Sequence, residues 1–158
     1  MTDFDVQSEA ADRDWMHAAL ALARHAAAAG EVPVGALVVR EDIVLGRGWN
    51  RPIGAQDATA HAEVCALREA CVHVGNYRLP GATLYSTLEP CAMCAGAIVH
   101  ARIARVVYAA DDLRAGAVHS IFSIFDEPRL THHVTHQGGV LAHESAQLLR
   151  QFFRQRRA

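Results

Sequence analysis

The chain has 158 residues, of which 51% are hydrophobic and 20% are charged, which is enough apolar material for the core of one globular domain. Its formal net charge of −2 excludes a uniformly basic surface, so any binding of nucleic acid must use a local basic patch. Four cysteines do not suggest a secreted disulfide framework, and neither an export signal nor a bilayer-length apolar run is present, so we expect a cytoplasmic protein with no membrane partner.

The first half of the chain predicts a helix, a hairpin and a second helix. Residues 13–29 carry apolar side chains at helical spacing among alanines and predict an amphipathic helix. Two apolar runs joined by a polar turn predict a β-hairpin, at residues 32–39 and 43–49. The segment 50–59 contains proline and glycine and predicts a loop, and a helix is expected at 60–74.

The second half alternates strand and helix patterns, which is typical of parallel crossover connections. The predicted strands span residues 82–87, 103–110 and 134–137. The predicted helices span residues 91–100, 120–125 and about 141–157. We therefore expect one domain over residues 1–158. Its fold class is α/β, a three-layer α/β/α sandwich with a mixed sheet of about five strands.

A Cys-x-x-Cys pair, Cys91 and Cys94, stands at the predicted start of a helix. This spacing brings both sulfurs to one tetrahedral metal ion, and His61 can add a nitrogen ligand while leaving a fourth position open. An open position is typical of catalytic zinc, which lowers the pKa of water toward about 7. Glu63, outside the ligand set, can then carry the proton to a leaving group. We expect one Zn²⁺ per chain.

The same residues are compatible with two other kinds of site. A lone Cys-x-x-Cys also occurs in redox proteins. Cys65 follows His61 by four residues, so on a regular helix the two share a face and could complete a closed structural zinc site. Regular geometry would also turn Glu63 about 200° away from His61. An N-cap at Thr59 would place His61 in the first turn, where both side chains reach a pocket, and we favour this catalytic arrangement.

Six segments give the chain a specific resemblance to a known family. They are residues 31–36 (EVPVGA), 48–52 (GWNRP), 59–63 (TAHAE), 76–79 (NYRL), 87–97 (TLEPCAMCAGA) and 105–108 (RVVY). The H-x-E…P-C-x-x-C pattern within them is the known signature of zinc nucleobase deaminases. The chain resembles the cytidine and deoxycytidylate deaminase superfamily and, more closely, the bacterial tRNA-specific adenosine deaminases.

The resemblance implies conversion of the wobble adenosine of a tRNA anticodon stem-loop to inosine, by a homodimer. We expect the dimer interface to cover the small and apolar residues of the run 95–98. The resemblance assigns His61, Cys91 and Cys94 to zinc and Glu63 to proton transfer. The substrate-binding residues that it implies are Val34, Asn50, Ala62 and Asp112. From the sequence pattern alone, Asn50 could instead be a turn residue and Val34 a core residue of a strand. The family also has glycine where His119 stands here.

The C-terminal helix is expected to contribute to RNA binding. Leu141, Leu148, Leu149 and Phe152 can face the sheet at helical spacing, which leaves Phe153 beside exposed arginines including Arg154 and Arg156. An exposed aromatic ring there suits stacking on an unpaired base. Two alternatives stay open: a deaminase of a free nucleobase or nucleotide, such as guanine or deoxycytidylate, and a non-enzymatic zinc-stabilised interaction module that uses Cys65.

Overall fold

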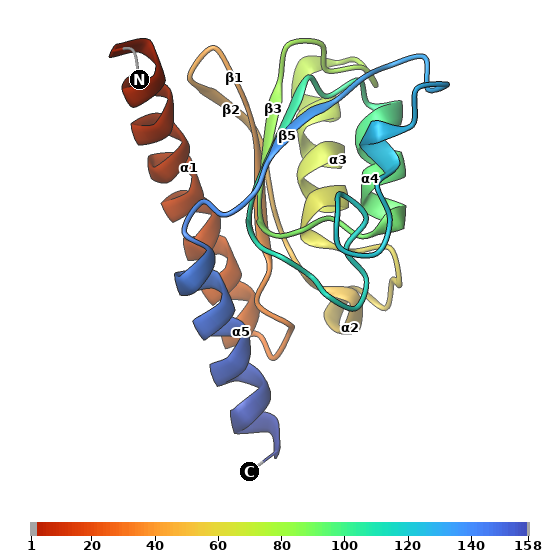
Figure 1. Ribbon diagram of the computed structural model, residues 1–158. Helices are drawn as coiled ribbons and strands as arrows, with labels where there is room; N and C mark the ends of the chain where they lie inside the picture. Colours follow the sequence, from red (N-terminus) through yellow and green to blue (C-terminus); the bar gives the residue numbers. More distant parts are fainter. Residues whose placement is uncertain (1–2, 158) are drawn as a thin grey trace.

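A five-stranded mixed β-sheet forms the centre of the protein in the computed structural model, which describes residues 3–157 and their side chains from residue 8 onward (Figure 1). The strand order is β2-β1-β3-β4-β5. The strands are β1 (Gly35–Arg40), β2 (Ile43–Trp49), β3 (Thr83–Leu88), β4 (Arg105–Ala110) and β5 (Thr135–Gln137). β1 pairs antiparallel with β2 and β3, whereas β3, β4 and β5 are parallel to one another.

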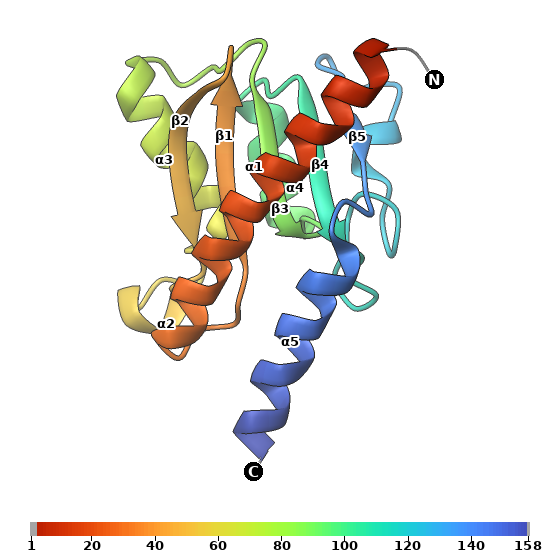
Figure 2. The same ribbon diagram turned by 90° about the vertical axis from the view of Figure 1, so that its left-hand side faces the viewer.

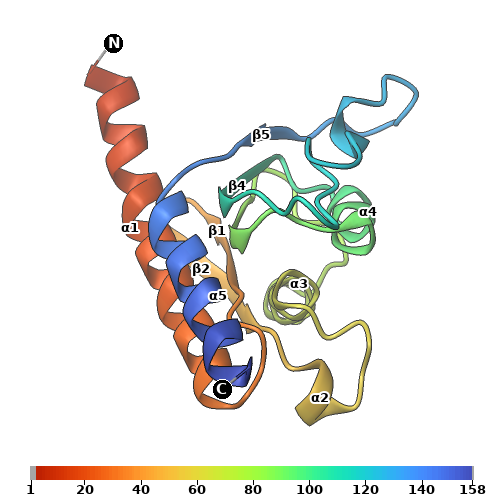
Figure 3. The ribbon, with the colours of Figure 1, turned by 60° about the horizontal axis from the view of Figure 1, so that its bottom comes forward.

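Helices cover both faces of this sheet. α3 (Ala62–Val74) and α4 (Ala92–His100) lie on one face, while α1 (Asp3–Ala28) and α5 (Ala142–Arg157) lie on the other (Figures 2 and 3). The predicted three-layer α/β/α sandwich is confirmed. Among residues 3–157, none of the helices combines the length and hydrophobicity that spanning a membrane requires.

The alternation of side chains along β1 explains why both faces are covered. Ala36 and Val38 belong to the core cluster that also contains residues of α3 and α4. Leu37 and Val39 point the opposite way and belong to a second cluster with residues of α1. Since neighbouring residues of a strand face opposite sides, a strand that is apolar at every position needs a helical layer on each face.

Two glycines of β2 let α3 approach the sheet closely. A Cβ atom at Gly48 would lie 2.2 Å from the carbonyl oxygen of Ala62, and one at Gly46 would lie 2.3 Å from that of Ala66. A side chain at either position would therefore push the helix away from the strand. The first turn of α3 is held against the end of β2 as a result, and this turn carries the residues of the candidate site.

A buried carboxylate joins α1 to the sheet. Asp12 is 3% exposed, and its two oxygens accept hydrogen bonds from the Arg105 guanidinium at 2.9 and 2.7 Å and from the Tyr85 hydroxyl at 2.8 Å. Burial and the neighbouring Asp12 raise the pKa of Tyr85, so its hydroxyl stays a donor. Because both donors come from the strands, this contact holds α1 against the sheet at residue 12, and the helix begins at Asp3, ten residues before the start that the sequence predicted.

Two further boundaries differ from the sequence prediction. The expected loop at 50–59 contains the short helix α2 (Pro52–Ala55), and the helix expected at 120–125 is wrong: only a 3-10 turn, η1 (Ile124–Asp126), forms there. The backbone N–H of Ser120 donates to the Glu89 carboxylate at 3.0 Å, and that of Ile121 donates to the Gly116 carbonyl at 2.9 Å. These contacts, the first of them between residues 31 positions apart, hold the segment in a loop. Of the acidic N-terminal stretch, residues 3–14 are helical, and Met1 and Thr2 lie outside the described residues.

Candidate active site

Two helix N-termini meet at the candidate metal site. His61 is the N-cap residue of α3, and Cys91 is the N-cap residue of α4. β2 and β3 are both antiparallel to β1, so they end at the same edge of the sheet, and the helix after each one starts there. The expected N-cap at Thr59 is wrong, because the Thr59 side chain hydrogen-bonds Asp57 at 2.7 Å and the helix begins two residues later.

The three predicted ligands lie at distances that fit zinc. Nδ1 of His61 lies 3.5 Å from Sγ of Cys91 and 3.5 Å from Sγ of Cys94. Zinc bonds of about 2.0 Å to nitrogen and 2.3 Å to sulfur at a tetrahedral angle place those atoms about 3.5 Å apart. The donor set therefore matches zinc in kind and in spacing. Zinc held there supplies Lewis acidity that makes water nucleophilic near neutral pH.

The surroundings of Cys91 favour the thiolate that a metal needs. Hydrogen bonds from Cys94 and from His61 lower the pKa of Cys91 to about 4, so the group is ionised at neutral pH. The adjacent Cys91 sulfur and burial raise the pKa of Cys94 instead. The hydrogen bond to Cys91 also raises the pKa of His61. The position at a helix N-terminus adds to the stability of the anion.

Glu63 lies in the first turn of α3, two residues after His61, and is 4% exposed. Burial raises the pKa of Glu63 to about 7, so this carboxyl group can gain or release a proton near neutral pH. It is not one of the three grouped ligands. These properties fit the proton carrier that the sequence predicts beside the metal site.

Cys65 does not complete a fourth ligand position. Among the described residues, the metal-type group at this site comprises His61, Cys91 and Cys94 alone. His61 has extended backbone angles as the N-cap residue, so it does not share the regular helix face of Cys65. The Cys65 side chain packs instead next to Gly48 of β2. The closed structural zinc site considered from the sequence is therefore wrong.

Hydrogen bonds connect three of the expected substrate-binding residues next to the ligand His61. The Asn50 side-chain oxygen accepts the Ala62 N–H at 2.9 Å, and the Asn50 N–H donates to the Val34 carbonyl at 3.0 Å. Asn50 therefore joins the end of β2 to the start of α3 and is not a turn residue that caps its own backbone. The side chains of Val34 and Ala62 are buried in the core.

The other expected substrate contacts line a groove of about 620 Å³ between α5 and the loop after β4. Asp112 and Arg114 lie on its loop side, and Phe153 and Arg154 lie on its helix side. The lining residues, which define the α5 groove, are Val32, Leu88, Asp111, Asp112, Leu113, Arg114, Ala115, Leu149, Arg150, Phe153, Arg154 and Arg157. Phe153 is 44% exposed, whereas Phe152 next to it is buried. The structure thus brings together residues about 40 positions apart.

One residue of α5 differs from the sequence expectation, and another is exposed as expected but makes a contact that the sequence did not indicate. Leu149 lines the α5 groove and does not belong to the cores under the sheet. The Arg156 guanidinium donates to the Gly30 carbonyl and stands 4.8 Å from the centre of the Phe152 ring. Arg156 therefore anchors the end of α5 to the loop after α1.

Sequence reasoning assigned no role to Glu89, whose buried carboxylate organises the loop after β4. It accepts the N–H groups of Asp112, Val118, His119 and Ser120, at 3.0 to 3.1 Å, and the Ser120 hydroxyl at 2.5 Å. Burial by itself raises the pKa of a carboxyl group, but the hydrogen bonds from Ser120, His119 and Asp112 outweigh it and lower the pKa of Glu89 to about 2. A charged residue directly before Pro90, at the end of an apolar strand, is the sequence signal for this role.

Glu31 was also missed, and it binds the segment that follows β2. Its carboxylate is buried and accepts the N–H groups of Ile53 at 3.2 Å and Gly54 at 2.8 Å. These donors belong to the start of α2, where helical N–H groups have no partner within the helix. Glu31 therefore holds the segment that follows Asn50.

Comparison with known proteins gives concordant similarities. The family model described as "Cytidine and deoxycytidylate deaminase zinc-binding region" matches residues 9–110. A protein of Haemophilus influenzae named tRNA-specific adenosine deaminase is 49% identical over 147 residues, which are 92% of this chain and 85% of that protein.

Solved structures extend the similarity to the fold. A structure from a study of A-to-I editing by tRNA:A34 deaminases at the wobble position has a TM-score of 0.82 and 46% identity, covering 85% of this chain and 97% of that one. A structure of guanine deaminase from Nitrosomonas europaea has a TM-score of 0.72 and 27% identity, covering 87% and 81%. The greater similarity is to the structure that concerns RNA.

Proposed function

The chain belongs to the cytidine and deoxycytidylate deaminase family, and from this premise we propose that it hydrolyses the wobble adenosine of a tRNA anticodon to inosine. The observation that carries the proposal is one arrangement in space. A three-ligand zinc site with a buried Glu63 lies in the same molecule as a groove lined by Phe153 and three arginines of α5. The first feature supports deamination, and the second supports a polyanionic substrate.

The reaction replaces the exocyclic amino group of adenine with oxygen. Water adds at C6, the C6–N bond breaks, and ammonia leaves, so no oxidant or reductant is required. Glu63 takes a proton from water and returns it to the leaving nitrogen. Asn50 is hydrogen-bonded to Ala62, the residue after the ligand His61, and we assign it to orienting the base together with Val34 and Ala62. Asp112 at the groove can accept a hydrogen bond from a ribose hydroxyl.

Deamination of a free nucleobase is the second candidate, because the guanine deaminase of Nitrosomonas europaea shares the fold. A small-molecule site has no need of a groove with arginines along its side. The test uses the wild-type protein with an anticodon stem-loop that contains the wobble adenosine, and with free guanine. Mass spectrometry should detect inosine in the RNA, with no turnover of guanine. Turnover of guanine without inosine formation would replace the proposal with the second candidate.

Phe153 and Arg154 are expected to contribute to RNA binding in different ways. Base stacking on an aromatic ring is worth about 1–3 kcal/mol, so Phe153→Ala should weaken stem-loop binding by about 5- to 150-fold. Its salt dependence should change little. Arg154→Gln should lower the slope of log Kd against log salt by about 0.7, because one phosphate contact is lost. Fluorescence anisotropy over a salt series measures both.

Tyr77→Ala is the matched control for these variants. Tyr77 is also an exposed aromatic residue beside an arginine, since its ring lies 5.2 Å from the Arg78 guanidinium, but it does not line the α5 groove. Equal weakening by Tyr77→Ala and Phe153→Ala would contradict a specific role of the groove. A chain shortened after Gln151 is a poorer comparison, because it also loses the buried Phe152 ring.

We also infer that the protein acts as a homodimer in the cytoplasm. The sequence expectation used the apolar run 95–98, but Ala95 and Ile98 are buried within the protomer. The outer face of α4 instead presents Met93, which is 37% exposed, together with Gly96 and Ala97, and the space over Gly96 is open. Light scattering at micromolar concentration should give twice the mass of one chain. None of the four cysteines forms a disulfide, which supports a reducing compartment.

A further inference from the structure

Glu89 stands between the metal-binding turn and the groove, and the proton transfers assigned to Glu63 do not use it. It follows the last residue of β3 and precedes Pro90 and the ligand Cys91. Its carboxylate is 2% exposed and receives five hydrogen bonds. A carboxylate buried to this degree is stable only when such donors surround it.

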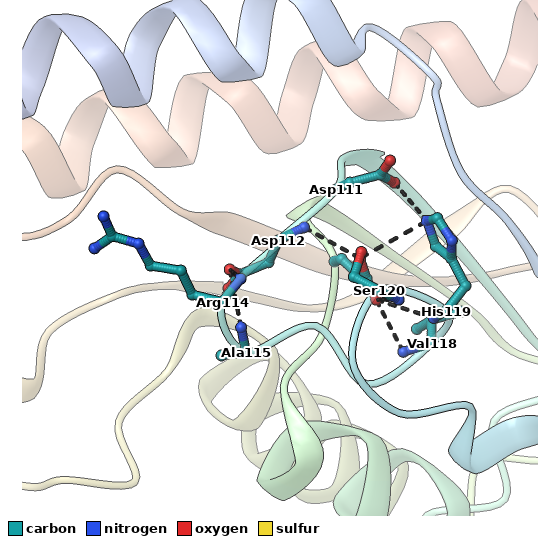
Figure 4. Close-up of polar contacts among 8 residues, drawn as sticks. Asp111, Asp112, Arg114, Ala115, Val118, His119 and Ser120 are labelled. Carbon is teal, nitrogen blue, oxygen red and sulfur yellow. Dashed lines mark hydrogen bonds and ion pairs between the residues drawn. The ribbon is translucent and has the colours of Figure 1, made fainter.

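All five donors belong to the loop at residues 111–120, called here the 111–120 loop. One comes from its beginning, the N–H of Asp112, and four come from its end, at Val118, His119 and Ser120 (Figure 4). Because the carboxylate accepts hydrogen bonds from both ends of the loop, it holds residue 112 close to residues 118–120. The His119 ring completes the closure from outside through its contact of 2.8 Å with Asp111.

The middle of the same loop contacts the metal-binding turn directly. The Ala117 N–H donates to the Pro90 carbonyl at 2.8 Å, and Gly116 forms a β-bridge with Cys91. A Cβ atom at Gly116 would lie 2.3 Å from the Glu89 carboxyl carbon, so even one methyl group would displace the carboxylate. The 111–120 loop is therefore fitted around Glu89 and against a zinc ligand.

The outer part of the loop forms one side of the α5 groove. Asp111, Asp112, Leu113, Arg114 and Ala115 all line it, opposite Phe153 and Arg154. The Asp112 side chain accepts the N–H groups of Arg114 at 3.1 Å and Ala115 at 3.2 Å, so the position of Asp112 determines that of the next residues. The Glu89 contact to the Asp112 N–H thereby fixes the loop side of the groove relative to Cys91.

We propose that Glu89 is a positioning residue for RNA recognition, which holds the 111–120 loop at the distance from the zinc site that the bound strand requires. Glu89 sets the affinity for RNA and takes no part in the proton transfers. The proposal rests on the tRNA deaminase function proposed above. It does not make Glu89, Asp111 and His119 a second metal site, although their ligand atoms lie within 4.8 Å of one another, because the loop donors occupy both Glu89 oxygens.

Glu89→Gln tests the proposal with little change in volume. The amide nitrogen cannot accept a hydrogen bond. If the amide nitrogen takes the place of Oε2, it faces the N–H groups of Val118, His119 and Ser120, and three donors lose their acceptor. If it takes the place of Oε1, only the Asp112 N–H loses its acceptor, because the Ser120 hydroxyl can rotate and accept a hydrogen bond from the amide. The second orientation costs less and releases the Asp112 end. An unpaired buried donor predicts a rise in KM for the stem-loop of about 10- to 100-fold.

The rate at saturating RNA should stay within about threefold of wild type, since a side chain that only positions the strand leaves the bound reaction unchanged. Zinc content should remain near one per chain. The matched control is Glu127→Gln, which removes an exposed carboxylate paired with Arg129 and should leave KM unchanged. A fall in kcat as large as the rise in KM would overturn the proposal, and so would an unchanged KM.

Two further variants approach the same contact from the loop. Gly116→Ala should raise KM by displacing the carboxylate, and combining it with Glu89→Gln should give less than the product of the two effects. Ser120→Ala removes one hydrogen-bond donor to Glu89 and provides the test if the other variants fail to fold. Its KM for the stem-loop should rise, and a KM equal to that of the wild type would overturn the proposal. Wild-type protein that forms no inosine in the stem-loop would instead refute the proposed function itself.

Discussion

Replacing Glu63 with glutamine is expected to abolish deamination of the stem-loop while leaving zinc content and fold intact. Glutamine fills the same buried space but cannot take a proton from water. Loss of general acid–base catalysis accounts for a fall of about 10²- to 10⁴-fold in kcat. Stem-loop affinity should change little, because Glu63 lies beside the metal ligands and does not line the α5 groove.

Glu69→Gln is the matched control, since Glu69 lies on the same helix but is exposed and accepts only the Arg47 N–H at 3.3 Å. Inosine formation by mass spectrometry under single-turnover conditions separates chemistry from product release, and elemental analysis gives the zinc content. Substantial turnover by zinc-loaded Glu63→Gln would remove Glu63 from the mechanism. Equal losses in both variants would indicate a general effect of charge on α3.

Cys91→Ala is expected to remove both zinc and activity. Because the pKa of Cys91 is low, its sulfur is already a thiolate at neutral pH and can bind a metal without first losing a proton. Its loss leaves only His61 and Cys94 in the ligand group. Zinc content should fall from about one per chain to less than about a tenth, because a two-ligand site holds zinc weakly. Inosine formation should fall below detection.

Cys65→Ala should retain zinc and activity, because Cys65 lies outside the ligand group among the described residues. The two cysteine variants are alike in chemistry and differ in position, so elemental analysis of both decides between the open and the closed site. Zinc loss in Cys65→Ala comparable to that in Cys91→Ala would restore a four-ligand structural site. Such a result would also exclude direct activation of water by the metal.

The sequence by itself determined the fold class and the chemistry of the zinc site. Apolar periodicity predicted the five strands, and the spacing of Cys91 and Cys94 fixed two ligands on one helix start. His61 and Glu63 were found because His-x-Glu and Cys-x-x-Cys together form a known pattern. Such features are local, so a short segment of chain contains all the information that they require.

Only the tertiary structure decided how the substrate side of the site is built. The Asn50 side chain accepts the first N–H of α3, and the α5 groove brings Asp112 together with Phe153. Glu89 accepts the N–H of Ser120, the first residue of the segment 120–125 that local pattern had predicted as a helix. These contacts join residues that are distant in sequence. The type and spacing of residues do not indicate from which distant N–H group a carboxylate accepts a hydrogen bond. That choice is made when β2 and β3 end at one edge of the sheet and the segments after them pack together.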